Sequence, residues 1–133
     1  KYSSKNIKRY SFSISEMNFI GDRVLNIKIK EKLNIYSKSV NERIFILEIT
    51  SKSEKITIAK DSAGDPTDFK NIIQVNVSVF MDDELIDDFS VSENFSYKND
   101  SDKFELESYE REIKNNLAEL ATEKLIIKIS DIQ

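Results

Sequence analysis

Apolar and polar residues alternate over much of the chain, which is the pattern of β-strands with one buried face. The clearest run covers residues 73–81, where every second residue is large and apolar. A short acidic stretch, residues 82–84, follows, and the alternation continues over residues 85–97. Two such runs around a short turn predict an antiparallel hairpin.

Two further strands are predicted in the first half of the chain. Residues 10–15 alternate between large apolar side chains and serines, and residues 43–60 are also typical of a strand. Within the second segment the apolar positions change from odd numbers (45, 47 and 49) to even numbers, at Ile56 and Ile58. Because side chains alternate strictly along a strand, we expect a bulge, bend or turn near residues 51–55.

Residues 24–38 fit two periods. Positions 25, 27 and 29 alternate as in a strand, whereas positions 25, 29, 33 and 36 repeat as in a helix. The length of the segment and its lysine-rich cluster at residues 28–32 favour a helix, for which Asp22 is a suitable N-cap.

A second, longer helix is predicted from Asp102 to about Lys128. Asp102 and Glu105 have the spacing of a capping box, and the acidic first turns suit the positive end of the helix dipole. The expected apolar stripe consists of Leu106, Tyr109, Ile113, Leu117, Leu120 and Ile127, widened by Ala121 and Leu125.

The resulting order of elements is β-α-β-β-β-α. It predicts an α+β fold, a two-layer sandwich in which a four-stranded, mainly antiparallel sheet is covered on one face by two helices. We assign residues 10–130 to this single domain and the polar, basic residues 1–9 to an N-terminal tether.

The composition excludes several kinds of covalent, metal-binding and catalytic site. The 133 residues contain no Cys and no His, which excludes disulfides, thiolate metal sites and catalysis that uses a histidine base. The sequence also contains no glycine-rich phosphate loop and no recognisable catalytic constellation. We predict no cofactor, no metal site and no catalytic residue. The longest apolar run, residues 44–47, is far too short to span a membrane.

Charge is distributed unevenly. Residues 1–60 hold 13 Lys and Arg against 6 Asp and Glu, whereas residues 61–133 hold 7 against 18. Lys55, Lys60 and Lys70 flank the polar loop at residues 61–68, whose aspartates we attribute to turn chemistry and not to a Ca²⁺ site. The lysines fit either a solvated strand end or a cationic rim for a phosphorylated or carboxylated ligand. The overall acidity argues against nucleic-acid binding.

The order and spacing of several features resemble the lipopolysaccharide-assembly lipoproteins of the LptE (rare lipoprotein B) type. The resemblance covers about residues 10–130. It rests on a helix at residues 22–36, the strand at 45–49, a polar loop, the long strand at 75–81, an Asp-containing turn at 82–83, a strand that ends at 96–97, and a terminal helix that contains residues 116–121.

The resemblance implies a non-enzymatic outer-membrane subunit that faces the periplasm. Such a subunit docks in a β-barrel translocon protein of the LptD type and contacts lipopolysaccharide, for which Lys55, Lys60 and Lys70 are the expected ligand-binding residues. The chain has no Cys, so we expect the acylated anchor to lie before Lys1. The usual glycine of the hairpin turn is replaced by Asp83-Glu84, which leaves the conformation of that turn open.

Two alternatives remain. An auxiliary lipoprotein of an ABC-type lipid transporter can have a similar sandwich. An enzyme such as a glycan hydrolase would need two carboxylates that face each other across a cleft.

Overall fold

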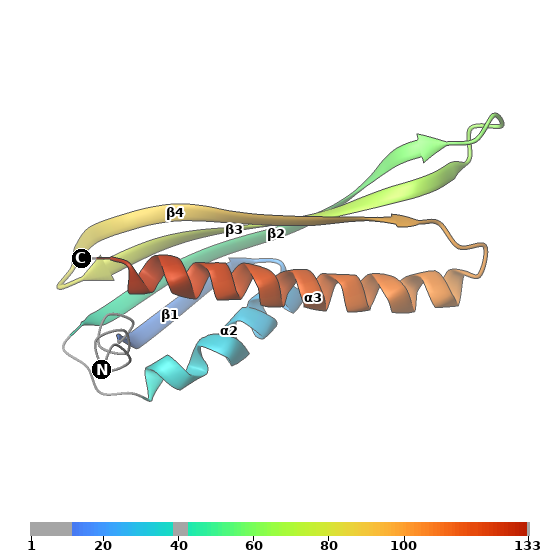
Figure 1. The fold of residues 1–133 in the computed structure, drawn as a ribbon. Coiled ribbons are helices and arrows are strands. Elements are labelled where there is room, and N and C mark those ends of the chain that lie inside the picture. Colours follow the sequence, from blue (N-terminus) through green and yellow to red (C-terminus); the bar gives the residue numbers. More distant parts are fainter. Residues whose placement is uncertain (1–11, 39–42, 133) are drawn as a thin grey trace, which may run out of the picture.

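The computed structural model describes residues 12–38 and 43–132, which form two layers (Figure 1). The predicted order of elements is confirmed. The elements are β1 (Ser13–Gly21), α2 (Arg23–Ser37), β2 (Ile44–Lys60), β3 (Pro66–Met81), β4 (Glu84–Lys98) and α3 (Lys103–Ser130).

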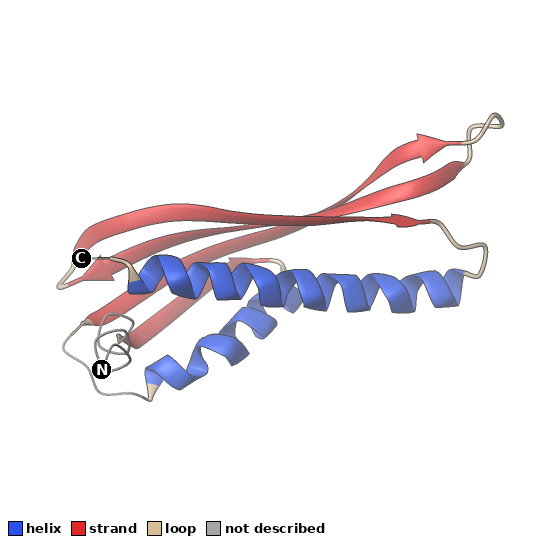
Figure 2. Cartoon of the chain, viewed as in Figure 1, coloured by secondary structure: helices blue, strands red, loops and turns tan. Residues whose placement is uncertain are grey.

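The four strands form one sheet in the order β1-β2-β3-β4. β1 runs parallel to β2, and the other two pairings are antiparallel. Both helices lie on the same face of the sheet and leave the opposite face without a helix (Figure 2). The predicted α+β sandwich with a mainly antiparallel sheet is therefore confirmed.

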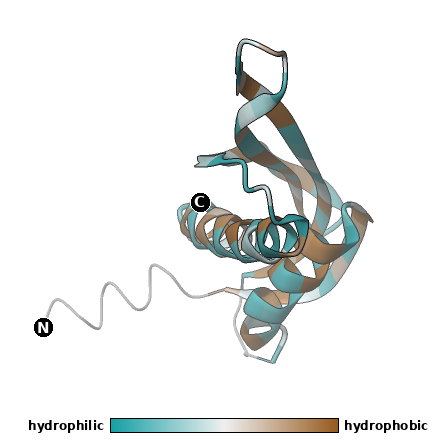
Figure 3. Ribbon diagram, turned by 90° about the vertical axis from the view of Figure 1, so that its right-hand side faces the viewer, coloured by the Kyte–Doolittle hydropathy of each residue, from teal (hydrophilic) through white to brown (hydrophobic). Residues whose placement is uncertain are grey.

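The core lies between this inner face and the helices. The strands alternate between apolar and polar positions, as Figure 3 shows from the end of the molecule. The register places the odd-numbered residues of β2 opposite those of β3, for example Leu47 opposite Val79, so that they share the inner face. The fully buried side chains include Leu25, Ile29, Leu33, Leu47, Ile73, Val75, Leu125 and Ile129.

The register of β2 is unbroken through residues 51–55, so of the predicted bulge, bend or turn, a bulge or turn there is wrong. The pairing with β3 is regular from Ile46 to Thr57, and the first irregularity leaves Ile58 as an extra residue before Ala59. Ile56 and Ile58 follow the opposite parity because they belong to the outer face. The inner positions of β2 over this stretch are polar, and they begin at Ser51, opposite which β1 ends at Gly21.

β1 begins at Ser13, later than predicted, and Tyr10 lies outside the described residues. A register shift between Ile14 and Glu16 moves the inner face from even to odd positions, so that Met17 and Phe19 pack against the core. At the end of the strand Gly21 has a φ of 109°, and a Cβ there would lie 2.0 Å from the carbonyl oxygen of Ser51. Only glycine fits this close approach.

The helical assignment of residues 24–38 is confirmed, and Asp22 is the N-cap of α2, accepting from the N–H of Leu25. Asp102 is likewise the N-cap of α3. The predicted capping box is half formed: the Asp102 carboxylate accepts from the Glu105 N–H, but the N–H of Asp102 donates to Asp100 and not to Glu105.

The predicted stripe of α3 needs a correction. Leu120 and Ile127 are 47% and 53% exposed, and Tyr109 is also exposed. The small residues Ala118 and Ala121 are buried in their place, which lets α3 approach the layer beneath it closely. The buried positions therefore recur mostly every four residues: Ile113, Leu117, Ala118, Ala121, Thr122, Leu125 and Ile129.

The β3–β4 turn is made by Asp82 and Asp83, which both have positive φ, at 53° and 65°. Two positive φ angles are the mark of a type I′ turn, which matches the twist of a hairpin. The turn thus keeps the hairpin geometry without glycine, since Asp tolerates the left-handed region better than most residues.

Candidate functional site

The sheet has a distal end, at which the β2–β3 hairpin turns. There β2 and β3 bend away from α3 (Figure 1). The N-terminal half of α3 and the inner face of the sheet border an open groove of about 330 Å³, called the polar groove below for the residue types that line it. Its lining residues are Ser53, Lys55, Asn71, Tyr97, Glu107, Glu110, Arg111 and Lys114.

Lys55, Tyr97 and Glu110 form the centre of this polar groove. The Lys55 Nζ lies 2.8 Å from a carboxylate oxygen of Glu110, and the Tyr97 hydroxyl donates to the same oxygen at 2.6 Å. Lys55 also lies over the ring of Phe69, 4.1 Å from its centre. Burial, together with the hydrogen bond to Glu110, raises the pKa of Tyr97 well above its usual value, so the phenol stays protonated.

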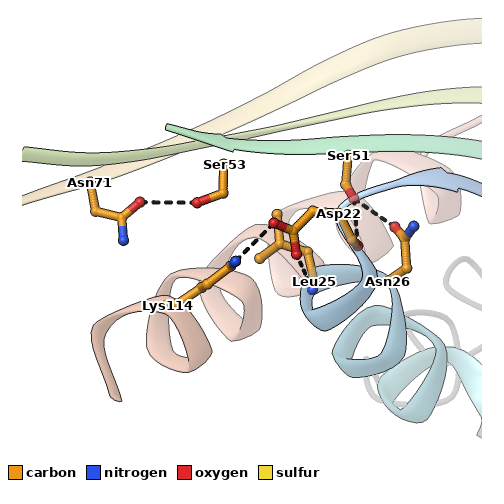
Figure 4. A network of polar contacts seen from close by, with 7 residues as sticks. All are labelled: Asp22, Leu25, Asn26, Ser51, Ser53, Asn71 and Lys114. Atoms are coloured by element: carbon orange, nitrogen blue, oxygen red, sulfur yellow. Dashed lines mark hydrogen bonds and ion pairs between the residues drawn. The ribbon is translucent and has the colours of Figure 1, made fainter. Parts of the chain in front are cut away.

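The inner end of the groove is closed by a second polar cluster (Figure 4). Lys114 donates to Asp22 at 2.8 Å. Burial alone would raise the pKa of Asp22, but the hydrogen bonds from Lys114 and from the Leu25 N–H outweigh it, so the pKa is lowered. Nearby, the Ser51 hydroxyl donates to the Asn26 amide oxygen at 2.6 Å. These contacts join α2, α3 and β2 where the apolar core ends.

Asn71 and Arg111 give the groove its remaining polar character. Asn71 is buried, and its amide oxygen accepts from the Ser53 hydroxyl at 3.2 Å (Figure 4). Arg111 is exposed on α3. The lining contains three cationic and two anionic side chains, and most of them are paired with each other or with Asp22. An arrangement of this kind holds two layers together and can present hydrogen bonds to a polar ligand.

The structure places the three predicted lysines near the distal end but on different surfaces. Lys55 faces the groove and α3. Lys70 is opposite Ile56 and Ser96 in the register, so it lies on the outer face, with the opposite parity to Asn71. Lys60 is exposed beside the hairpin tip, paired with Pro66. The three do not form one continuous rim.

The loop at the hairpin tip owes its shape to turn chemistry, as predicted. The Asp61 carboxylate accepts from the N–H groups of Ala63 and Asp65, both at 2.9 Å. In the described part of the chain, no group of three acidic, histidine or cysteine side chains is placed to hold a metal ion.

Tyr97, Asn71 and Glu110 were missed as site residues by the sequence reasoning, which assigned Tyr97 to the core and Glu110 to the helix dipole. The sequence does contain a signal that could have located this groove. Positions 53, 55 and 71 continue the inward parity of their strands but carry polar side chains. Polar residues at core-facing positions mark where the sandwich opens.

The outer face of the sheet is polar at its centre and apolar towards its ends. The Ser90 hydroxyl donates to Asn76 across the β3–β4 pair. Ile20, Ile44 and Leu85 are exposed large apolar residues. Neither helix in the described ranges combines the length and the hydropathy that crossing a membrane requires.

This chain is similar to known proteins in structure and not detectably in sequence. No protein-family model matches the sequence. No curated protein matches it significantly either. Among solved structures, rare lipoprotein B from Shewanella oneidensis superposes with a TM-score of 0.59 at 14% identity, over 85% of this chain and 95% of that one. The chain has the rare lipoprotein B fold.

Two other structures agree with it. A minor lipoprotein from Acinetobacter baumannii matches with a TM-score of 0.59 at 14% identity, covering 88% of this chain and 94% of that one. Lipoprotein B from Nitrosomonas europaea gives a TM-score of 0.57 at 12% identity, covering 89% and 86%. The resemblance to rare lipoprotein B that the sequence predicted is therefore confirmed at the level of fold.

Proposed function

We propose that this chain is a non-enzymatic accessory subunit of lipopolysaccharide assembly. In this proposal it is held at the periplasmic face of the outer membrane by a lipid anchor that lies outside the 133 residues. It docks in a β-barrel translocon protein of the LptD type and contacts lipopolysaccharide. The observation that carries the proposal is the rare lipoprotein B fold, shared over 85% of this chain and 95% of the Shewanella oneidensis protein.

The polar groove supports a binding role. Its acidic side chain Glu110 is engaged by both Lys55 and Tyr97, and Lys114 is engaged by Asp22. Hydrolysis by a carboxylate pair requires one acid to protonate the leaving group and another to act from the opposite side of the bond. Glu107 and Glu110 both lie on α3, on the same wall of the groove, so the groove supports recognition and not this chemistry.

Contact with lipopolysaccharide is assigned to the distal end of the sheet. Lipopolysaccharide is anionic, and ammonium groups bind phosphate as point charges. Lys60 at the hairpin tip is exposed, and Lys70 is partly exposed on the outer face. Lys55 is already paired with Glu110, so we give it a secondary part in this contact.

Affinity capture of the full-length protein from cell envelopes tests the proposal. We expect an outer-membrane β-barrel protein to co-purify, identified by mass spectrometry, together with lipopolysaccharide. A Lys60→Glu, Lys70→Glu variant should retain the barrel protein but lose most of the lipopolysaccharide. Capture of an inner-membrane permease instead would overturn the proposal and favour the transporter-associated alternative.

A further inference from the structure

The distal half of β2 has one open edge. β1 pairs with β2 only as far as Ser51. β2 then continues to Lys60, paired with β3 on its other side. In the part of the chain that the structure describes, no strand lies beside residues 52–60 on the β1 side, since β1 is the end strand of the sheet.

The backbone of this edge is oriented for strand pairing. The Ser51 carbonyl accepts from the N–H of Asp22 at 3.0 Å, so Ser51 directs its backbone groups towards the β1 side. Backbone direction alternates along a strand, and the register is regular up to Thr57. Ser53, Lys55 and Thr57 therefore direct their N–H and C=O groups to the open edge.

The side chains along this edge favour an acidic partner. Lys52 lies on this edge and Lys60 just beyond it, and both are exposed, whereas Glu54 lies between them and Lys55 is engaged by Glu110. Lysines on an edge strand discourage pairing with a like-charged edge, including the same edge of a second copy. They attract a segment that carries carboxylates.

The partner would also need apolar residues at alternate positions. Ile56 is half-buried on the outer face. An added strand can place an apolar side chain beside Ile56, where a cross-strand apolar pair is stabilising. The extra residue at Ile58 disrupts the pairing pattern there, so the usable edge covers residues 52–57.

We propose that residues 52–57 of β2 bind an extended acidic segment of another protein as an additional strand of the sheet. Backbone hydrogen bonds to Ser53, Lys55 and Thr57 would supply most of the affinity, and the lysines would select the acidic partner. This inference stands on the open edge alone and does not depend on lipopolysaccharide binding.

The probe is a synthetic peptide, Val-Glu-Val-Glu-Val-Asp-Val, added to the folded protein. Amide hydrogen exchange measured by NMR should slow at least tenfold at Ser53, Lys55 and Thr57 when the peptide is saturating. The same peptide with lysine at its three acidic positions should give no protection. No protection by the acidic peptide at millimolar concentration would overturn the proposal.

Two variants sharpen the test. Thr57→Pro removes an outward N–H but no bond to β3, so it should weaken peptide binding at least tenfold. Thr57→Val retains the N–H and should bind as the wild type does. Equal binding by both variants would overturn the proposal, as would self-association without peptide that Thr57→Pro abolishes, because the occupant would then be a second copy.

Variants that reverse the charge of the lysines test the proposal even if Thr57→Pro fails to fold. Lys52→Glu combined with Lys60→Glu should switch the preference from the acidic to the lysine peptide. Lys30→Glu combined with Lys38→Glu makes the same change of net charge away from the edge and should leave the preference unaltered. If the Lys52→Glu, Lys60→Glu variant still preferred the acidic peptide, the proposal that these lysines select an acidic partner would be overturned.

Discussion

Lys114 of α3 lies 2.8 Å from the carboxylate of Asp22, 92 positions earlier in the chain. The same carboxylate caps α2 by accepting from the Leu25 N–H at 2.9 Å. The Asp22 side chain thus caps the start of α2, directly after β1, and also binds α3. This contact marks the boundary between the apolar core and the polar groove, and it makes Asp22 the most informative polar residue to change.

Replacing Asp22 separates its two roles. Asp22→Asn keeps an N-cap oxygen but removes the ion pair, whereas Asp22→Ala removes both and should lose a further 0.5–2 kcal/mol or so of unfolding free energy. Because the folded pKa of Asp22 is lowered, its stabilisation is complete above the usual carboxyl range and is lost as the pH falls through the lowered value. The difference in unfolding free energy between the wild type and Asp22→Asn, measured in urea, should therefore be constant near neutral pH and shrink as the pH falls below the usual carboxyl range. A difference that does not change on acidification would contradict the assignment.

The corrected stripe of α3 predicts a contrast between two leucines. Leu117 is 4% exposed, so Leu117→Ala should lower the free energy of unfolding by about 2–5 kcal/mol. Leu120, three residues later, is largely exposed, and Leu120→Ala should cost less than about 0.5 kcal/mol. Denaturant unfolding measures both. Similar losses for the two variants would mean that α3 is rotated about its axis relative to this structure.

The β3–β4 turn can be stabilised by glycine. Asp83 occupies the left-handed region, which costs most residues with a side chain about 1–2 kcal/mol, Asp somewhat less, and glycine nothing. After the entropy that glycine regains in the unfolded chain, Asp83→Gly should raise the stability by about 0.5–1 kcal/mol. Glu84→Gly is the control, since Glu84 begins β4 without positive φ and should lose stability. A lower melting temperature for Asp83→Gly would contradict the type I′ assignment.

Binding of purified lipopolysaccharide should depend on Lys60 and Lys70 together. Each contact at a wet surface is weak, so a single Lys→Ala change should do little. Lys60→Glu with Lys70→Glu should weaken binding at least tenfold, about 1.4 kcal/mol, and the wild-type affinity should fall with added salt. The Lys30→Glu, Lys38→Glu pair, on α2 and at its C-cap, is the matched control. Affinity that is insensitive to both salt and these lysines would remove them from the site.

Lys55 needs a different substitution in this experiment. Lys55→Glu would place a second carboxylate against Glu110, so the triple change of Lys55, Lys60 and Lys70 to Glu would also destabilise the fold. Lys55→Gln removes the charge without this repulsion and is the proper addition to the double variant.

The alternation in β3 and β4 and the amphipathic period of α2 predicted the fold because each element has one apolar face. The sequence could not show that the polar residues at inner positions of β2 beyond Ser51 lie past the end of β1, because that depends on the pairing of the strands. For the same reason Ile56 and Ile58 suggested a bulge, when they belong to the outer face. The pairing of Lys55 with Glu110 joins residues from β2 and α3, which only the tertiary structure brings together.

The central claim is that the whole sandwich docks inside an outer-membrane barrel. A photo-crosslinking residue at Asn76, on the outer face, and another at Glu112, on exposed α3, test it in living cells. Because a protein inside a barrel is surrounded by it, both positions should crosslink to the same outer-membrane β-barrel protein. Crosslinks from both positions to an inner-membrane permease, or to no outer-membrane protein, would contradict the account.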